Sequence, residues 1–194
     1  MDISREDAEQ SLSLIEETAT QTIKSLISTN YSSIHIIWGV VWLIGFLGTH
    51  FFLKWVWPIW IALSFLGSVA TFVIIRQQFR TGNPTKIPTA KKFGQRLFWF
   101  WTLLFVYIFV LISIVAPING LQINALFCSM GMFAYVVTGL WTKSGYLVWL
   151  GLAVTATTLI GYFLIPHNYY CLWMAITGGG ALVGTGLYLQ LRWR

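Results

Sequence analysis

Five glycines fall within ten residues, TGGGALVGTG at 177–186, and their spacing raises the possibility of a nucleotide site. The order Gly180-x-x-x-Gly184-x-Gly186 can mark the turn where a dinucleotide phosphate meets the start of a helix. That use requires a preceding strand and an acidic residue about 20 positions later to hold the ribose. No acidic residue follows position 17, and threonine follows Gly184 where a P-loop has lysine. The sequence therefore argues against a nucleotide site.

The same stretch favours close helix packing in a membrane. In lipid no hydrophobic effect drives helices together, so they associate through tight van der Waals contact. Small side chains allow this contact because they let the backbones approach. Two small-x-x-x-small ridges lie at helical spacing, formed by Thr177, Gly180, Ala181, Gly184 and Thr185. We expect this helix to be central in the bundle or to face another subunit.

Histidines are the remaining candidates for chemistry, because no carboxylate occurs in the apolar part of the chain. His50 and His167 are both expected at the outer membrane boundary, where they could ligate a haem axially or hold a chlorin. Exposure of both rings to lipid headgroups is the alternative. His35 precedes His50 by 15 residues, about 22 Å along a helix, so these two cannot share a metal in one subunit.

The sequence shows no catalytic constellation. Cys128 and Cys171 are the only thiols, and their expected depths in the membrane do not favour a disulfide. Hydrolysis by a serine or cysteine nucleophile would need an acid to orient the base, and residues 18–194 contain none. We therefore expect no enzymatic activity, no metal site and, unless the histidines ligate haem or chlorin, no cofactor.

Basic residues are concentrated in one connection, residues 76–96, which holds six of the twelve Lys and Arg and no acid. These six are Arg76, Arg80, Lys86, Lys91, Lys92 and Arg96. A basic segment beside two membrane spans suits anionic lipid headgroups, at about 1 kcal/mol per Lys or Arg near the surface, better than it suits nucleic acid. The acidic N-terminal segment is a second partner that could compete for the same residues.

The composition places all of these groups in a membrane protein. Of the 194 residues, 57% are apolar and 9% are charged, against about 25% charged in soluble domains, and the mean hydropathy is +0.71. Six apolar runs have the roughly 20 residues that a bilayer demands. They cover residues 34–53, 56–75, 97–116, 121–141, 145–165 and 170–191. We expect an all-α polytopic membrane protein with six transmembrane helices in three hairpins.

The distribution of positive charge predicts the orientation, because Lys and Arg in short loops stay on the cytoplasmic side. Residues 76–96, Lys143, Arg192 and Arg194 would share one side, whereas the other side has Lys54 alone. Both termini are therefore expected in the cytoplasm, with the chain in the cell (inner) membrane.

The N-terminal segment differs in character from the rest of the chain. All six carboxylates lie within the first 17 residues, and apolar residues recur at helical spacing at positions 8, 12, 15, 19, 23 and 26. Ser4 to Asp7 resembles a capping box. The segment lacks the basic stretch and the apolar core of a signal peptide, so we do not expect it to be one. We expect residues 1–32 to form a cytoplasmic acidic amphipathic helix ahead of a six-helix domain, 33–194. Six acids against two basic residues give this segment a net charge of −4, which favours docking on protein over anionic lipid.

A faint parallel repeat relates the first two spans to the last two. Each pair has Gly-aromatic near the end of its first span, a histidine after it, and Trp-x-Ala at the start of its second span. The matching residues are Gly45 and Gly161, His50 and His167, and Trp60 and Trp173. Transporters are often built from repeats, but hairpins in lipid also converge on such patterns.

Three classes of function remain open. The first is a non-enzymatic membrane subunit or scaffold that packs with itself or with other membrane proteins and docks its acidic helix. The second is a small transporter or channel for a neutral or anionic solute, consistent with spans that lack carboxylates. The third is a haem- or pigment-binding subunit. In span number the chain resembles the substrate-binding subunits of energy-coupling-factor vitamin transporters, but its first span lacks their Ala-x-x-x-Ala patch, so no functional residue carries over.

Overall fold

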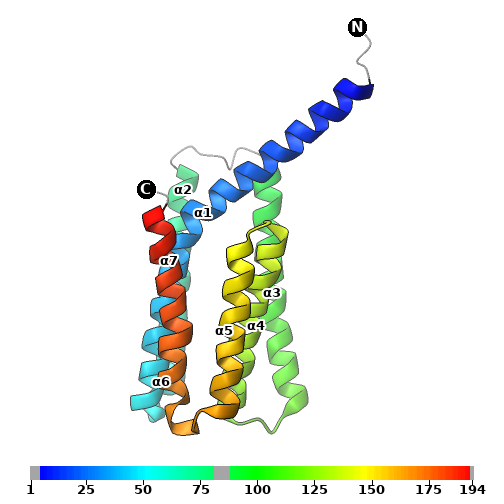
Figure 1. Cartoon of the computed structure of the whole chain (residues 1–194). Helices are drawn as coiled ribbons and strands as arrows, with labels where there is room; N and C mark the ends of the chain where they lie inside the picture. The colour runs from blue at the N-terminus through cyan, green and yellow to red at the C-terminus, as the bar shows by residue number, and fades with distance from the viewer. Residues whose placement is uncertain (1–4, 81–87, 193–194) are drawn as a thin grey trace.

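The structure, a computed structural model, describes residues 5–80 and 88–192, which are helical with no strand among them (Figure 1). Its α-helices are α1 (Arg5–Phe51), α2 (Val56–Arg80), α3 (Pro88–Val115), α4 (Gly120–Trp141), α5 (Gly145–Leu164), α6 (Tyr170–Met174) and α7 (Gly180–Arg192). A π-helical turn, η3 (Ala175–Gly179), joins α6 to α7. Counting α6 to α7 as one unit, six helices are long and apolar enough to cross a membrane. The predicted all-α chain with six such helices is confirmed.

Local sequence explains where α4 begins and ends. Asn119 is the N-cap, and its side chain accepts a hydrogen bond from the Gln122 backbone N–H at 2.8 Å. The Gln122 side chain in turn accepts from the Asn119 N–H at 3.0 Å, which completes a capping box. At the other end, Lys143 has a φ of 52° and the Ser144 N–H donates to the Gly139 carbonyl at 2.8 Å. This tight turn lets α5 return directly along α4.

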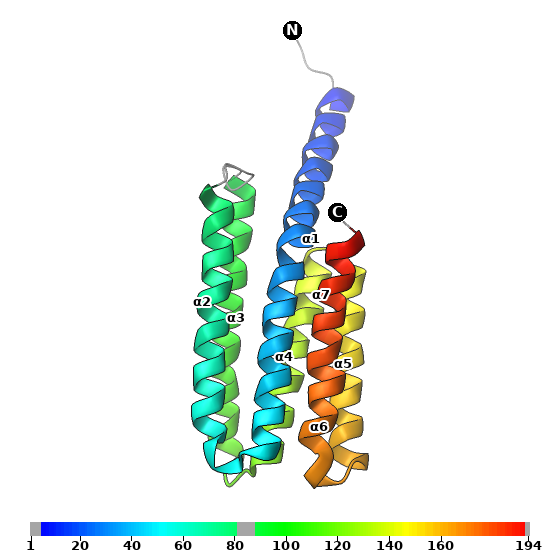
Figure 2. The same ribbon diagram turned by 90° about the vertical axis from the view of Figure 1, so that its left-hand side faces the viewer.

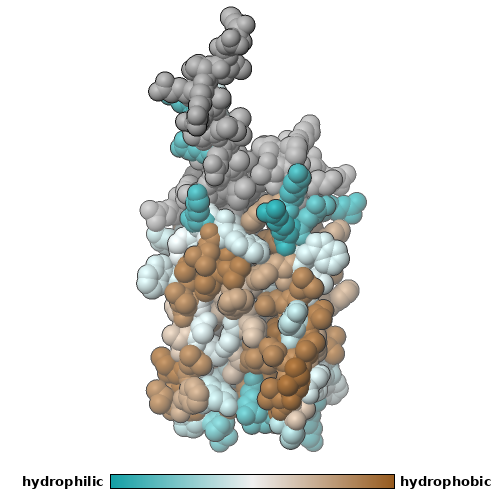
Figure 3. Space-filling view, turned by 90° about the vertical axis from the view of Figure 1, so that its right-hand side faces the viewer, coloured by the Kyte–Doolittle hydropathy of each residue, from teal (hydrophilic) through white to brown (hydrophobic). Residues whose placement is uncertain are grey.

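The helices alternate in direction, so that charged groups collect at the two ends of the bundle (Figure 1). One end holds the last residues of α2 and α7, the start of α3 and the α4–α5 turn; we call it the basic end. It carries Arg76, Lys92, Arg96 and Lys143. The other end, with His50 and His167, is called the histidine end. Figure 3 shows hydrophilic side chains at both ends and apolar side chains over the body between them.

The acidic N-terminal segment and the first span are one helix. Of the 47 residues of α1, 20 (Ser32–Phe51) form the apolar span, which leaves 27 residues before it. At 1.5 Å per residue these extend for about 40 Å, and they project away from the bundle (Figures 1 and 2). The expected boundary at residue 32 therefore falls inside a continuous helix. The expected capping residue Ser4 lies outside the described residues.

Glycines bring two pairs of segments into backbone contact, α1 with the continuous η3–α7 segment and α4 with α5, and these are the most extensive interfaces in the bundle. In the first pair a Cβ would lie 2.6 Å from the Val183 nitrogen at Gly39, 2.8 Å from the Leu43 nitrogen at Gly179 and 2.7 Å from the Ser32 oxygen at Gly186. In the second pair, a Cβ would lie 2.8 Å from the Val148 nitrogen at Gly139 and 2.8 Å from the Met132 oxygen at Gly151. Of these two pairs, α4 and α5 are consecutive helices, whereas α1 and α7 are far apart in the sequence. The arrangement of the six helices as three hairpins stays a prediction.

Buried side chains fill the space between these two pairs. One cluster lies toward the histidine end and consists of Phe46, Cys128, Tyr170, Met174 and Ala175. The second cluster consists of Met132, Leu150, Val154 and Leu182, with Trp42, Tyr135 and Ala181 packed against it. Each cluster draws on helices from both pairs, so α1, α4, α5 and the α6–α7 unit form one inner bundle.

Helices α2 and α3 lie outside this inner bundle. Only 6% of the residues in the apolar segment of α2 and 11% of those in α3 are buried, against 28–39% in the other four segments. Trp60 attaches α2 to α1, and its indole N–H donates to Thr49 Oγ1 at 2.9 Å. Aromatic pairs attach α3 to α4, including Phe109 with Phe127 at a ring distance of 6.1 Å. Both outer helices therefore leave most of their apolar surface open.

Candidate functional site

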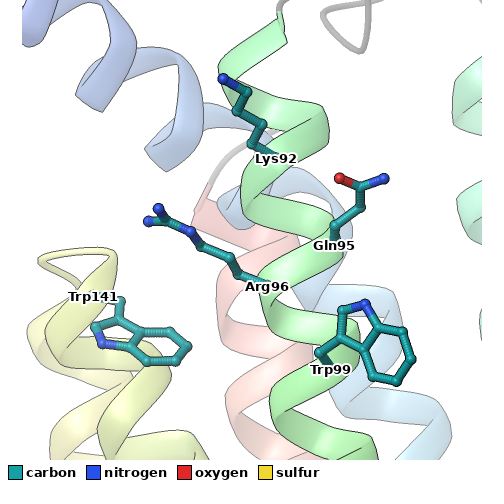
Figure 4. A pocket seen from close by; sticks show the side chains of 5 residues that line it. All are labelled: Lys92, Gln95, Arg96, Trp99 and Trp141. Carbon is teal, nitrogen blue, oxygen red and sulfur yellow. The ribbon is translucent and has the colours of Figure 1, made fainter.

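A pocket of about 570 Å³ opens between α3 and the end of α4, at the basic end (Figure 4). Lys92, Gln95, Arg96 and Trp99 line it from α3, and Trp141 lines it from α4. The α3 positions are spaced i, i+3, i+4 and i+7, which places them along one face of the helix. In Figure 4 the Arg96 side chain extends from α3 toward α4, and the Trp141 ring reaches back toward α3.

The pocket carries positive charge that the six apolar helices and their connections cannot neutralise. Lys92 and Arg96 are exposed, and their helix positions are one turn apart. No Asp or Glu occurs after position 17, so no carboxylate from the six spans or their connections can pair with them. The cations are therefore available to an anion that the membrane or another molecule supplies.

An apolar hollow follows the pocket along α3. It has a volume of about 220 Å³ and is lined by Phe100, Leu103, Leu104 and Tyr107. These positions continue the helical spacing of Lys92, Arg96 and Trp99, so polar and apolar linings form one stripe on α3. The Phe100 ring packs against Trp141 at 5.1 Å, which links the two parts.

The predicted basic residues are only partly gathered in this pocket. Lys92 and Arg96 line it, whereas Arg76 is exposed near the end of α2. Arg80 and Lys91 are placed only by the backbones of α2 and α3, and Lys86 lies outside the described residues. The expected contact of these six residues with lipid or with the acidic segment stays a prediction.

Sequence reasoning did not single out Gln95, Trp99 or Trp141 as members of this site. The first two could have been found from the helical spacing with Lys92 and Arg96. Trp141 lies on another helix and 42 residues later in the chain than Trp99, so only the packing of α3 on α4 brings it there.

A buried polar cluster lies inside the bundle near the basic end. The His35 side chain on α1 is fully buried. Its ring lies edge-on to the Tyr135 ring of α4 at 5.2 Å and 6.3 Å from the Tyr146 ring of α5. Thr138, one turn from Tyr135, is also buried. These aromatic contacts make His35 part of the interface between the two helix pairs.

The two histidines proposed as cofactor ligands are both at the histidine end. The His50 ring packs edge-on to Phe51 at 4.8 Å, and His167 is exposed in the short 3₁₀ turn His167–Tyr169. Among the residues whose side chains the structure describes, no three of His, Cys, Asp or Glu come together as a metal site. Haem or chlorin ligation by His50 and His167 stays a prediction, which a visible absorption spectrum of the purified protein would test.

The predicted glycine ridges have different surroundings on their two faces. Ala181 packs against the second core cluster, and Thr177 Oγ1 donates to the Trp173 carbonyl at 2.8 Å. A Cβ at Gly180 or Gly184 would meet nothing within 4 Å, and Gly184 is exposed, whereas Thr185 is half-buried. The close contacts within the chain are made by Gly179 and Gly186 instead. Packing through Gly180 and Gly184 therefore remains a prediction about contacts with another chain.

Comparisons of the chain with protein-family models, with curated proteins and with solved structures find no match. Any function assigned to these residues therefore rests on their own surroundings in the structure.

Proposed function

We propose that the chain is a non-enzymatic, multi-pass subunit of the cell membrane that recruits a soluble protein through the projecting part of α1. The six apolar helices support membrane insertion. The concentration of Lys and Arg at the basic end supports a cytoplasmic position for that end and for both termini, because positive loops are retained inside. In this orientation the projecting part of α1 stands in the cytoplasm.

The observation that carries this proposal is the continuity of α1 from Arg5 to Phe51. A helix without a break holds whatever binds its first half at a fixed distance and angle from the membrane. Its membrane half is in backbone contact with α7 at Gly39 and Gly186, so binding at one end is coupled mechanically to the inner bundle. A helix that only tethered the chain would not need this rigidity.

The chemistry of the projecting segment indicates the kind of partner. Its sequence combines an apolar residue at each helical turn from position 8 to 26 with five of the six carboxylates of the chain, Glu6, Asp7, Glu9, Glu16 and Glu17. An amphipathic helix needs a surface to cover its apolar face, and its negative charge disfavours anionic lipid. The matching partner is a protein with an apolar groove that is bordered by Lys and Arg.

The filled interior favours this function over solute transport. Phe46, Met132, Leu147, Met174 and Leu182 are completely or almost completely buried where the helix pairs meet. A solute pathway through the inner bundle would have to displace these side chains. No carboxylate after position 17 is present to bind a coupling cation.

Affinity purification of the full chain after cross-linking in native membranes tests the proposal. A soluble protein that co-purifies with the wild type should be lost when Glu16 and Glu17 are both replaced by Lys, because the docking surface then repels it. The variant Gln10→Lys adds a positive charge to the same helix but keeps every acid, and it should retain most of the partner. Membrane insertion should be unchanged in both variants.

Two results would refute the proposal. One is an identical set of co-purified proteins with the wild type and with a variant that lacks residues 1–26. The other is flux of a solute through the purified chain in vesicles with no soluble partner bound, which would favour the transporter class.

A further inference from the structure

We infer that the pocket between α3 and α4 binds one anionic phospholipid. Its phosphate lies between Lys92 and Arg96, and an acyl chain follows α3 along Phe100, Leu103, Leu104 and Tyr107. The described residues that line this site belong to α3 and α4, and the inference does not depend on recruitment of a partner.

The two cations match the charge and geometry of a phosphodiester. Side chains at i and i+4 on a helix have Cβ atoms about 5–6 Å apart, close enough to contact one phosphate together. Arginine can bind two phosphate oxygens with parallel N–H donors, and lysine adds a compact positive charge. Gln95 also lines the pocket and contributes an uncharged donor and acceptor for the polar part of the headgroup.

The absence of carboxylates after position 17 favours an anionic lipid over a zwitterionic one. With no acid in the spans or their connections, the lipid is the available source of counter-charge at this depth. Each Lys or Arg at a bilayer surface gives about a fivefold preference for anionic lipid, so two of them give roughly 30-fold.

The position of the pocket agrees with the dimensions of one leaflet. Trp99 and Trp141 are half or more exposed beside the cations, as expected for tryptophan at the level of the headgroups. The 11 helical steps from Arg96 to Tyr107 span about 16 Å, and one leaflet contributes about 15 Å of hydrocarbon. The apolar hollow thus lies where an acyl chain would run when the phosphate is at Lys92 and Arg96.

The apolar hollow favours a phospholipid over free phosphate as the ligand of this site. A soluble anion would use the cations alone and would give no reason for an apolar hollow on the same face of α3. Occupation by a lipid uses both parts, and the hollow presents the exposed side chains of Leu103 and Tyr107 and the half-buried side chains of Phe100 and Leu104 to the acyl chain.

Lipid binding to the full-length protein in detergent, after removal of native lipid, tests the inference. We expect phosphatidylglycerol to bind the wild type and phosphatidylcholine with the same acyl chains to bind about 30-fold more weakly. The double variant Lys92→Gln/Arg96→Gln should lower the phosphatidylglycerol affinity by about 10- to 30-fold. The double variant Arg76→Gln/Lys143→Gln removes the same charge from the same end outside the pocket, and it should change the affinity less than threefold. All four side chains are exposed, so both variants should keep the wild-type melting temperature without lipid.

A second variant tests the acyl chain. Leu104→Trp fills the apolar hollow and should weaken phosphatidylglycerol binding at least fivefold, while leaving any binding of glycerol phosphate unchanged. Equal losses in the two double variants would overturn the inference, because they would show diffuse surface charge. Inorganic phosphate or glycerol phosphate that competes as well as the intact lipid would also overturn it, because the site would then hold an anion only.

Discussion

The inner bundle and the two outer helices hold together by different means. Where α1 meets α7, and where α4 meets α5, glycines place main-chain atoms of one helix against the other. Helices α2 and α3 are instead attached by aromatic side chains and leave most of their apolar residues exposed. Because lipid solvates apolar side chains as well as protein does, burial cannot decide which helices pair. Close backbone approach can decide which helices pair, and among the described glycines it is confined to the inner pairs.

The faint repeat in the sequence gives a second comparison. In α1–α2 the Trp60 ring lies in the notch at Gly45, and in the last two spans the Trp173 ring lies in the notch at Gly161, with nearest approaches to an added Cβ of 2.9 and 2.6 Å. Yet α2 stays outside the inner bundle, whereas the α6–α7 unit forms part of it. The same contact therefore anchors a helix without fixing how deeply it is buried.

Gly179→Leu should have the largest effect, because Leu43 main-chain atoms occupy the position of the new side chain. We expect a loss of about 3 kcal/mol in stability, seen as a lower melting temperature in detergent. Gly184→Leu, five residues away on α7, meets no neighbour and should stay within about 0.5 kcal/mol. A smaller oligomer for Gly184→Leu would show that this ridge packs between chains; equal stability of both variants would contradict the α1–α7 contact.

Alanine scanning of two glycines separates the inner pair α4–α5 from the outer helix α3. Gly151→Ala should destabilise the protein by about 1–2 kcal/mol, because its Cβ would be 2.8 Å from the Met132 carbonyl oxygen. Gly94→Ala on α3 has open space and should stabilise by about 0.5–1 kcal/mol through lower chain entropy. Thermal melts of both variants check the sign, and two effects of the same sign would contradict the distinction.

Tryptophan-to-phenylalanine changes compare the two halves of the repeat. The Trp173 indole N–H donates to the Thr157 carbonyl at 2.8 Å, and Trp60 donates to the Thr49 hydroxyl at 2.9 Å. Each Phe variant should lose about 1 kcal/mol with its hydrogen bond. Trp149→Phe, on an exposed part of α5, is the control and should have no measurable effect. If only one of the two Phe variants lost stability, the two tryptophan contacts of the repeat would not contribute equally to stability.

The smallest effect is expected on the outer surface of α2. Phe65 is 68% exposed, so Phe65→Leu should change stability by less than about 0.5 kcal/mol. The matched change Phe46→Leu, at a fully buried ring, should cost about 1–1.5 kcal/mol in the same melting experiment. A comparable loss at Phe65 would mean that α2 is covered by another protein surface.

The glycine contacts within the chain could not be read from sequence spacing. Gly179 and Gly186 make the contacts with α1, and packing through Gly180 and Gly184 stays a prediction about another chain. The π-helical turn Ala175–Gly179 adds a residue to the helix and rotates the following positions relative to an ideal 3.6-residue period. Spacing counted from the sequence cannot reveal this rotation, because it depends on the packing of α1 against the turn.

The candidate site likewise combines residues that the sequence could identify with one that only the tertiary structure adds. Its cations were among the residues that charge patterning identified, and helical spacing adds Gln95 and Trp99. Trp141 joins them only because α3 packs beside the end of α4. The acidic segment and the first apolar segment form one helix, because neither proline nor glycine interrupts the sequence from Arg5 to Trp38. The division of the chain at residue 32 stays a prediction.

By itself, the sequence determined the number of spans, their helical state and the collection of basic residues at one end. Those properties follow from the length of each apolar run and from its need to satisfy its own backbone hydrogen bonds in lipid. Only the tertiary structure decided which helices pair and which glycines they use. An apolar side chain does not by itself indicate whether its position contacts another helix, so contact between backbones selects the pairs and leaves most of the apolar residues of α2 and α3 exposed.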